Sequence, residues 1–439
     1  MNILSAARGL TGDTLAFHLL LVTFGVGLPI VISIFELIYL INKKPYYKAV
    51  VKTWTKALVV LFIAGAVSGM IVSMSFSIIW PQFISFAGKV VGVGFALEGF
   101  AFFVEVLFLL VYVLSFDKFK PIYHWLISLM LVISSSGSAF FITSVNAWMN
   151  DPTGFRLNSK GQPIDINPWK AIFNKATPTE VSHSIVAYIL CVLLVLLAVH
   201  SWPFLKNKYK KQEVKYKNRI ELINILVILA LIFSLAVAVL GDASGKYLAK
   251  NEPYKLAAAE GIIHTQSHAP LVIGDIVHGN SVSGGLKIPG LLSYLSTGST
   301  KGVVIGLDSF PASQRPPLYV HYFFDAMAGI GTFIVGYLVL YVFFVTYRKK
   351  LVGRKFLTYG FLLLAILGMC AVEFGWLTTE FGRQPYIIHG VMLVSQAVNH
   401  SKTIIGFSEL FPVLYVILFI LTIIALKRIK SEITEKDSI

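Results

Sequence analysis

The sequence predicts an all-α membrane protein in which about nine helices cross the bilayer as a bundle. Apolar residues make up 56% of the 439-residue chain and charged residues only 13%, whereas soluble domains carry roughly 25% charged residues. Uncharged stretches recur at about the 20 residues that a helix needs to cross a hydrocarbon core. A soluble enzyme, a coiled coil and a disordered protein are therefore excluded. We expect one integral membrane domain over residues 1–439.

Nine apolar segments, separated by polar or basic stretches, define the predicted spans. The first is too long for the apolar core of a signal peptide and lacks a small-residue cleavage site. The fourth is the most polar, because it contains Ser134, Ser135, Ser136 and Ser138, whose hydroxyls can bond to neighbouring helices. The predicted spans are Leu15–Ile41, Ala57–Ile79, Gly94–Ser115, His124–Met149, His183–Leu205, Ile220–Leu240, Leu318–Thr346, Phe356–Thr378 and Ile405–Leu426.

The net charge of +15 reflects membrane topology and not nucleic-acid binding. Most Lys and Arg residues lie after the odd-numbered spans, and the strongest cluster is Lys206–Arg219. Because cytoplasmic loops carry the excess of basic residues, we expect the N-terminus outside, the C-terminus in the cytoplasm and a prokaryotic plasma membrane. Cys191 and Cys370 both lie within apolar spans, so we interpret them as small core residues.

Residues 241–317 form the longer of two long segments on the predicted outer side. This segment is rich in Gly, Ser, His and Pro and contains a helix-like patch, Tyr254–His264. Loops of this length are usually functional or disordered. The helix-like patch favours function, and we interpret residues 241–317 as an outer binding loop.

Ionisable side chains inside predicted spans are candidates for function because burying them in a membrane is costly. Five candidate ligands from five helices lie at a similar depth near the outer face: His18, Glu98, His183, Met327 and Glu380. Such a set suits cofactors held inside a helix bundle, and a His/Met pair is typical of a six-coordinate, electron-transferring haem. Zinc would need closer spacing and more Cys or His ligands. Glu105, Asp325, Glu373 and Arg383 complete the set of polar candidates.

Each of these residues also has a purely structural interpretation. His18 can be a packed core histidine, His183 a residue at a helix start, and Met327 a filler of an irregular gap. Glu98 and Glu105 lie on nearly one helix face, about 10.5 Å apart along the axis, so they either relay protons or bond to neighbouring helices. Arg383 can merely neutralise Glu380. Most of the remaining histidines are expected to be solvated or interfacial: His124, His200, His264, His268, His278, His321, His389 and His400.

Several ordered motifs carry a resemblance to a known family. The strongest is Gly-Trp-Leu-Thr-Thr-Glu-Phe-Gly-Arg-Gln-Pro over residues 375–385, and others are Ala-Leu-Glu-Gly at 96–99, Asn-Ala-Trp-Met at 146–149, Gly-Asp-Ala-Ser-Gly at 241–245 and Lys-Leu-Ala-Ala-Ala-Glu at 255–260. With the nine spans, they cover nearly the whole chain. The sequence resembles subunit I of the cytochrome bd quinol oxidases.

This resemblance implies a role for each matching residue. His183 and Met327 would be the axial ligands of a low-spin haem b, while His18 and Glu380 would bind a high-spin haem pair, one haem b and either haem d or a further haem b. Glu98 would lie at the oxygen-reducing haem and Glu105 on a proton path. The resemblance places Arg383 and Trp376 near the haems and Lys255 and Glu260 in quinol binding.

The resemblance also implies an activity and partners. The complex would oxidise membrane quinol at the outer face and reduce O2 to water with cytoplasmic protons, which separates charge without pumping. A second membrane subunit, either subunit II or a paralogue of this chain, would complete the complex. No nucleic acid is expected as a partner.

Two departures keep other hypotheses open. Glu105 follows Glu98 by seven residues where the family usually has eight, and one residue rotates a helix position by about 100°. Asp325 stands where the family usually has Arg, which should lower the potential of the low-spin haem. A related haem protein with another electron donor or weak O2 reduction is one alternative. A haem-free secondary transporter is the other, although paired Gly/Pro-broken helices are not evident.

Overall fold

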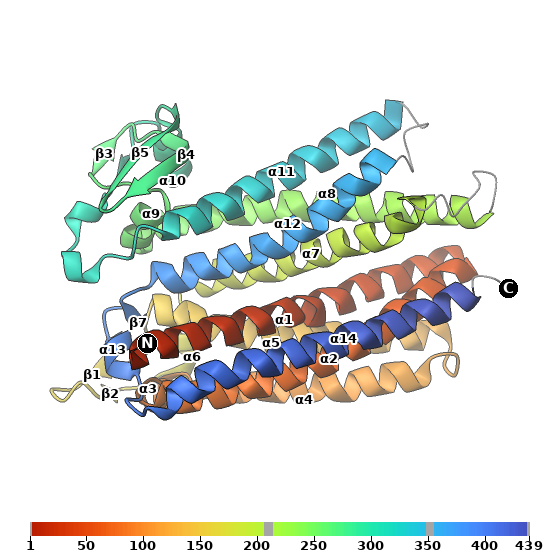
Figure 1. Ribbon diagram of the computed structural model, residues 1–439, viewed down its shortest axis with the longest axis horizontal. Coiled ribbons are helices and arrows are strands. Elements are labelled where there is room, and N and C mark those ends of the chain that lie inside the picture. The colour runs from red at the N-terminus through yellow and green to blue at the C-terminus, as the bar shows by residue number, and fades with distance from the viewer. Residues whose placement is uncertain (1, 206–213, 348–354, 437–439) are drawn as a thin grey trace. The chain divides into compact units, whose positions relative to one another are not determined.

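Nine long apolar helices form the described part of the computed structural model, which covers residues 2–205, 214–347 and 355–436 (Figure 1). Each is long and apolar enough to cross a membrane, and helices satisfy their own backbone hydrogen bonds in lipid. The predicted fold class is confirmed, while the orientation of the termini stays a prediction. The nine helices are α1 (Ile3–Asn42), α2 (Pro45–Ile79), α4 (Gly92–Ser115), α5 (Pro121–Asn150), α7 (Thr177–Leu205), α8 (Val214–Asn251), α11 (Val320–Tyr347), α12 (Lys355–Gly382) and α14 (Thr403–Lys436).

Several helices are longer than their apolar segments. Helix α1 begins at Ile3, because the Asn2 side chain accepts a hydrogen bond from Ser5 N at 2.7 Å and caps the first turn. Helix α2 begins with Pro45, a residue suited to the first helical position. Helix α8 continues to Asn251, so the loop predicted to begin at Gly241 starts after Asn251 in the structure. Hydropathy detects only the apolar part of a helix, which explains these differences.

The chain divides into two contact units. The first comprises residues 1–145, 154–172 and 395–439. In it, α1 packs against α2 and α14, and α2 also packs against α14. The stacked rings of Phe62 and Phe102, 5.4 Å apart, join α2 to α4. The short elements of this unit are α3 (Pro81–Val90), β1 (Arg156–Leu157), β2 (Pro163–Ile164) and α6 (Pro168–Ile172).

The second unit comprises residues 146–153 and 173–394. Its four long helices pack in a ring: α7 against α8, α8 against α11, α11 against α12, and α12 against α7. Helices α7 and α11 therefore face each other diagonally, with α8 and α12 between them. The prediction of a single membrane domain stays a prediction, because two contact units can belong to one domain.

The segment between α8 and α11 is folded around a small core of its own. Leu256, Ile262, Ala269, Leu292 and Val304 are buried together, so this loop is ordered by hydrophobic packing. Strands β4 and β5 form an antiparallel hairpin that turns at Gly279. The elements are α9 (Pro253–Ala259), β3 (Gln266–Ser267), β4 (Leu271–His278), β5 (Ser281–Ile288), α10 (Leu291–Thr297), β6 (Val303–Val304), η1 (Leu307–Ser309) and η2 (Ala312–Gln314); β7 (Tyr386–Ile388), β8 (Met392–Leu393) and α13 (Val394–Ala397) follow α12.

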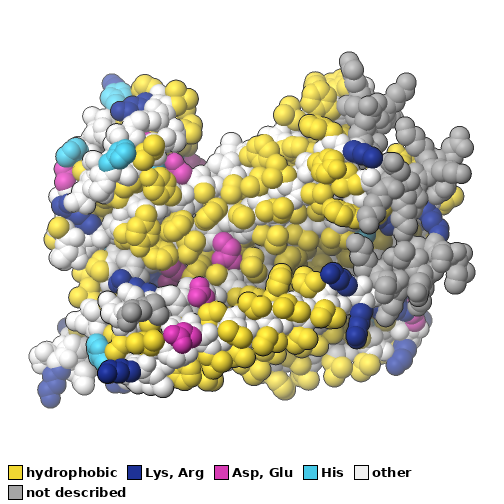
Figure 2. Space-filling view, viewed as in Figure 1, with side chains coloured by type: hydrophobic (Ala, Val, Ile, Leu, Met, Phe, Trp, Pro, Cys, Tyr) yellow, Lys and Arg dark blue, Asp and Glu magenta, His cyan; other side chains and the backbone are white. Residues whose placement is uncertain are grey.

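Hydrophobic side chains dominate the surface along the lengths of the helices (Figure 2). Phe100, Phe103, Leu110, Phe343 and Ile366 are among the large apolar side chains that remain exposed. Exposed apolar side chains of this kind, present on each unit, fit contact with lipid or with a second membrane subunit.

Candidate functional site

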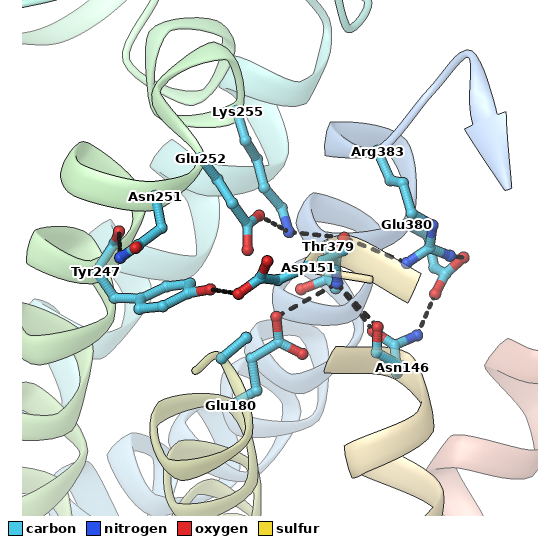
Figure 3. A network of polar contacts seen from close by, with 12 residues as sticks. Asn146, Asp151, Glu180, Tyr247, Asn251, Glu252, Lys255, Thr379, Glu380 and Arg383 are labelled. Carbon is cyan, nitrogen blue, oxygen red and sulfur yellow. Dashed lines mark hydrogen bonds and ion pairs between the residues drawn. The ribbon is translucent and has the colours of Figure 1, made fainter. Parts of the chain in front are cut away.

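A network of buried polar side chains joins the end of α12 to the end of α5 (Figure 3). Arg383, which is 2% exposed, donates to Glu380 Oε2 at 2.6 Å and to Asn150 Oδ1 at 3.3 Å. Asn146 donates to the other oxygen of Glu380 at 2.5 Å. The Glu380 carboxylate is thus oriented by two donors, one of them charged, which makes its position well defined.

Lys255 extends the network toward α9. Its Nζ donates to Glu252 Oε2 and to Asn150 Oδ1, each at 3.1 Å, and both charged side chains are almost fully buried. Gly382 makes this possible, because a Cβ at that position would lie 2.8 Å from Lys255 Cγ. The end of α12 therefore accommodates the lysine stem, and Asn150 links Lys255 to Arg383.

Residues that the sequence did not mark complete the network. Asn150 Nδ2 donates to Glu180 Oε1 at 3.3 Å, and Tyr247 donates to Asp151 Oδ2 at 3.1 Å. Glu252 Oε1 and Arg383 Nε are buried without a hydrogen-bond partner in the described part of the chain. A buried network with unused donors and acceptors can hold and pass protons or accept a polar ligand.

His183 and Met327 occupy diagonal helices of the second unit, each within about two turns of its helix start. Each faces a glycine on the next helix in the chain. A Cβ at Gly241 would lie 3.5 Å from His183 Cε1, and a Cβ at Gly375 would lie 3.0 Å from Met327 Sδ. His183 Nδ1 is buried without a partner in the described residues. An unbonded imidazole and a thioether, on facing helices lined by glycines, fit a flat iron-bearing group.

His18 lies in the first unit with one ring nitrogen fixed. Ser68 donates its proton to the Gly65 carbonyl oxygen at 2.9 Å, so it accepts from His18 Nδ1, also at 2.9 Å. This leaves His18 Nε2 with its lone pair available, which is the arrangement of metal-binding histidines. A Cβ at Gly69 would lie 3.0 Å from the ring. Glu380 belongs to the other unit, so joint binding of one haem pair by His18 and Glu380 stays a prediction.

The two glutamates of α4 lie in the first unit. Glu105 is 5% exposed, and Glu98 accepts a hydrogen bond from Ser138 of α5 at 3.3 Å. Ser138 is therefore one of the predicted serine hydroxyls that bonds to a neighbouring helix. Trp376 is half-buried on α12, and its proximity to a haem stays a prediction.

Glu260 and Lys255 belong to different clusters, although both flank α9. Glu260 is 9% exposed, and burial together with the negative charge of Asp325 raises its pKa to about 8. Its neighbours are His321, Asp275 and Asp325. Lys255 instead contacts Glu252 and Asn150, so a ligand bound to both residues would have to bridge two polar clusters.

Two histidines contradict the expectation of solvated or interfacial positions. His321 is 1% exposed because the Ala259 carbonyl and Asp275 accept its hydrogen bonds. His124 is 5% exposed because Glu36 and the Tyr112 carbonyl bond to its ring. Both lie at the ends of predicted spans, where sequence alone does not show whether another element covers them. His264, His268, His278 and His400 are exposed, as expected.

Comparison with known proteins decides the family. The profile described as "Cytochrome bd terminal oxidase subunit I" matches residues 6–433. The chain belongs to this family. "Putative cytochrome bd menaquinol oxidase subunit I" of Bacillus subtilis (strain 168) is 32% identical, over 95% of this chain and 94% of that relative. "Cytochrome bd ubiquinol oxidase subunit 1" of the same strain is 27% identical, over 98% and 94%.

A solved structure agrees with this membership. The bd oxidase from Geobacillus thermodenitrificans matches with a TM-score of 0.92 and 35% identity, over 98% of this chain and 99% of that one. The predicted activity of a quinol:oxygen oxidoreductase and the multi-pass plasma-membrane location are confirmed at the level of the family. Cytochrome bd subunits I contain haem and work in a complex with further subunits.

Proposed function

We propose that this chain is the haem-binding subunit that takes electrons from membrane quinol at the outer face and delivers them to O2, using protons from the cytoplasm. The observation that carries this proposal is the placement of His183 and Met327 on diagonal helices, each against a glycine. When bound, the haems carry single electrons and hold the O2 that is reduced.

The chemistry of the side chains indicates which residues would bind each haem iron. His183 and Met327 would hold the low-spin haem b, since imidazole and thioether are the ligands of such an iron. His18 and Glu380 would hold the high-spin pair, composed of one haem b and either haem d or a further haem b. Arg383 and Asn146 support this role for Glu380, because they fix both of its oxygens.

Protons would reach the oxygen-reducing side along α4. Glu105 is the deeper carboxylate from the predicted outer face, and Glu98 is the one with a hydroxyl partner, Ser138. A carboxylic acid in an apolar surrounding can alternate between protonated and ionised forms as charge nearby changes. The two side chains would therefore pass protons outward in single steps.

Quinol would bind beside α9, with Lys255 and Glu260 as the residues that contact it. Their separate clusters support contacts to different parts of the quinol. Lys255 would donate a hydrogen bond to a quinol oxygen. Glu260, whose pKa is raised to about 8, would exchange a proton with quinol near neutral pH. A second membrane subunit, subunit II or a paralogue, would cover part of the apolar surface.

The test is a set of single variants in the purified complex, examined by reduced-minus-oxidised optical spectra and haem extraction. His183→Ala and Met327→Ala should each remove the low-spin haem signature, whereas His268→Ala, an exposed histidine of the outer segment, should not. An unchanged spectrum in His183→Ala would overturn the ligand assignment.

Asp325 favours one alternative, a related electron-transfer protein with another donor, because it replaces the usual cation near the low-spin haem with an anion. Quinol-driven O2 uptake by the wild-type complex separates the two functions. Rapid uptake supports the oxidase, and haem reduction without uptake supports the alternative.

A further inference from the structure

A second cluster of possible ligands lies outside the haem and α4 residues. Asp275 of β4 and His321 and Asp325 of α11 each present one nitrogen or oxygen atom, and these atoms lie within 4.8 Å of one another. Asp275 and His321 are buried, and Asp325 is partly exposed. The cluster therefore joins the β4–β5 hairpin to the start of α11 and has a side open for exchange.

The tautomer of His321 is informative. Its Nδ1 lies 2.8 Å from the Ala259 carbonyl oxygen, which can only accept, so Nδ1 carries a proton. Nε2 then lies 2.8 Å from Asp275 Oδ1 and 3.6 Å from Asp325 Oδ2. A lone pair on Nε2 would face two anionic oxygens, so a cation or a second proton must lie between them. A backbone carbonyl on the far nitrogen is the usual support of a metal-bound imidazole.

Glu260 provides an independent observation. It is 9% exposed and lies close enough to Asp325, His321 and Asp275 to interact with their charges. It follows Ala259, whose carbonyl holds His321. No Lys or Arg in the described chain forms an ion pair with any of the four side chains. With Nδ1–H donated to the Ala259 carbonyl and Nε2 without a proton, His321 is neutral, and a divalent ion would then balance the carboxylates that gather here.

We propose that Asp275, His321 and Asp325 bind one divalent transition-metal ion of the Mn²⁺ or Zn²⁺ type, beside Glu260. One imidazole with several carboxylate oxygens suits these ions, while Ca²⁺ prefers oxygen ligands alone. The ion clamps the β4–β5 hairpin onto α11, next to the hydrogen bond from Val277 N to Tyr322 Oη at 2.8 Å. The three ligands of this site are not themselves proposed haem ligands, although Asp325 precedes Met327 by two residues and the site adjoins Glu260, a proposed quinol contact.

The experiment uses the purified complex with its haems. After treatment with EDTA, samples are dialysed against MnCl2 or ZnCl2. The number of bound Mn²⁺ or Zn²⁺ ions per complex is then measured by mass spectrometry, with haem iron counted separately. Wild type should retain one ion, and Asp275→Asn and Asp325→Asn should weaken binding at least about tenfold. His264→Ala is the matched control, because it removes an exposed histidine that pairs with Asp308 at 2.9 Å in the same outer segment, and its metal content should equal that of wild type.

Pulsed EPR of the Mn²⁺-loaded wild type gives a second readout that does not depend on folding of the variants. Coupling to one histidine nitrogen supports the site, and its absence overturns it. Wild type that retains neither ion also overturns the proposal and leaves a protonated His321 between the two aspartates. Equal metal content in wild type and in folded Asp275→Asn and Asp325→Asn would place the ion elsewhere and reject this site.

Discussion

Replacing Gly375 by Ala should displace Met327 without removing a ligand. An added Cβ would lie 3.0 Å from Met327 Sδ, whereas ordinary contacts begin at 3.4 Å. The sulfur must therefore retreat by at least 3.4 − 3.0 = 0.4 Å, or α11 and α12 must separate. A helix-interior Gly→Ala change alone would stabilise the fold by about 0.5–1 kcal/mol, but overpacking costs about 1–3 kcal/mol. We expect a net loss of about 1–2 kcal/mol.

The experiment measures axial ligation of the low-spin haem as well as the stability of the protein. If Met327 binds the low-spin iron, the displaced sulfur weakens that bond, and a fraction of the haem becomes five-coordinate. Carbon monoxide binding to the reduced complex should then rise, and the thioether–iron band in magnetic circular dichroism should fall. The apparent Tm measures the change in stability of the fold.

Two glycines on neighbouring elements provide matched controls. Gly329 of α11 has open space where a Cβ would be, and a Cβ at Gly241 would meet His183 only at an ordinary 3.5 Å. Gly329→Ala and Gly241→Ala should leave ligation unchanged. A Gly375→Ala protein with wild-type carbon monoxide binding and an undiminished thioether band would refute the reasoning.

Three further predictions follow from the buried polar groups. Glu105→Gln should lower quinol-driven O2 uptake at least about 100-fold while quinol still reduces the low-spin haem in stopped-flow spectra; equal loss of both steps would contradict a role in proton delivery. Lys255→Gln should cost about 3–5 kcal/mol, because Glu252 keeps a buried charge without its cation. The double variant Glu252→Gln/Lys255→Gln removes both charges and should restore the Tm to that of wild type but not the KM for quinol. A restored KM would show that Lys255 has a purely structural role. His389 stacks on Tyr254 with ring centroids 4.1 Å apart. Burial and the positive charges of Lys255 and Arg383 lower the pKa of His389 from 6.5 to about 4. Between pH 6.5 and about 4 the unfolded chain binds more protons than the folded chain, so the stability of the fold decreases as the pH falls. His389→Phe should keep the stack and lose part of this acid sensitivity in Tm measured from pH 7 to 4, and an unchanged slope would contradict the assignment.

The helix order could be predicted, because a membrane restricts the backbone to long apolar helices. A membrane also makes each polar residue within a span conspicuous as a candidate. His183 and Met327 stand out for this reason. Asn150 could not be predicted in the same way. It is a neutral residue at the end of a span, and its importance arises because Glu180, Lys255 and Arg383 converge on it in the fold.

The cluster around His321 shows the same limit more sharply. Its partner Asp275 lies 46 residues away in sequence, on a hairpin whose strands are mostly exposed. Neither periodicity nor hydropathy connects these two residues. The sequence alone therefore indicates an interfacial position for His321, whereas in the fold α9 and the β4–β5 hairpin contact and bury it.

The three predicted His and Met ligands share a local arrangement within the hairpins that carry them. His183 and Met327 lie in the first turns of α7 and α11, whereas His18 lies about four turns into α1. Each faces a glycine in the second half of the next helix, namely Gly69 of α2, Gly241 of α8 and Gly375 of α12. Each pair is thus internal to one antiparallel helical hairpin. The first helices of the three hairpins are the first, fifth and seventh spans, so all three would cross the membrane in the same direction. An added Cβ would lie 3.0 Å from His18 at Gly69 and 3.0 Å from Met327 at Gly375, so Gly→Ala at these two positions should move the predicted ligand, whereas the ordinary 3.5 Å contact at Gly241 should leave His183 in place.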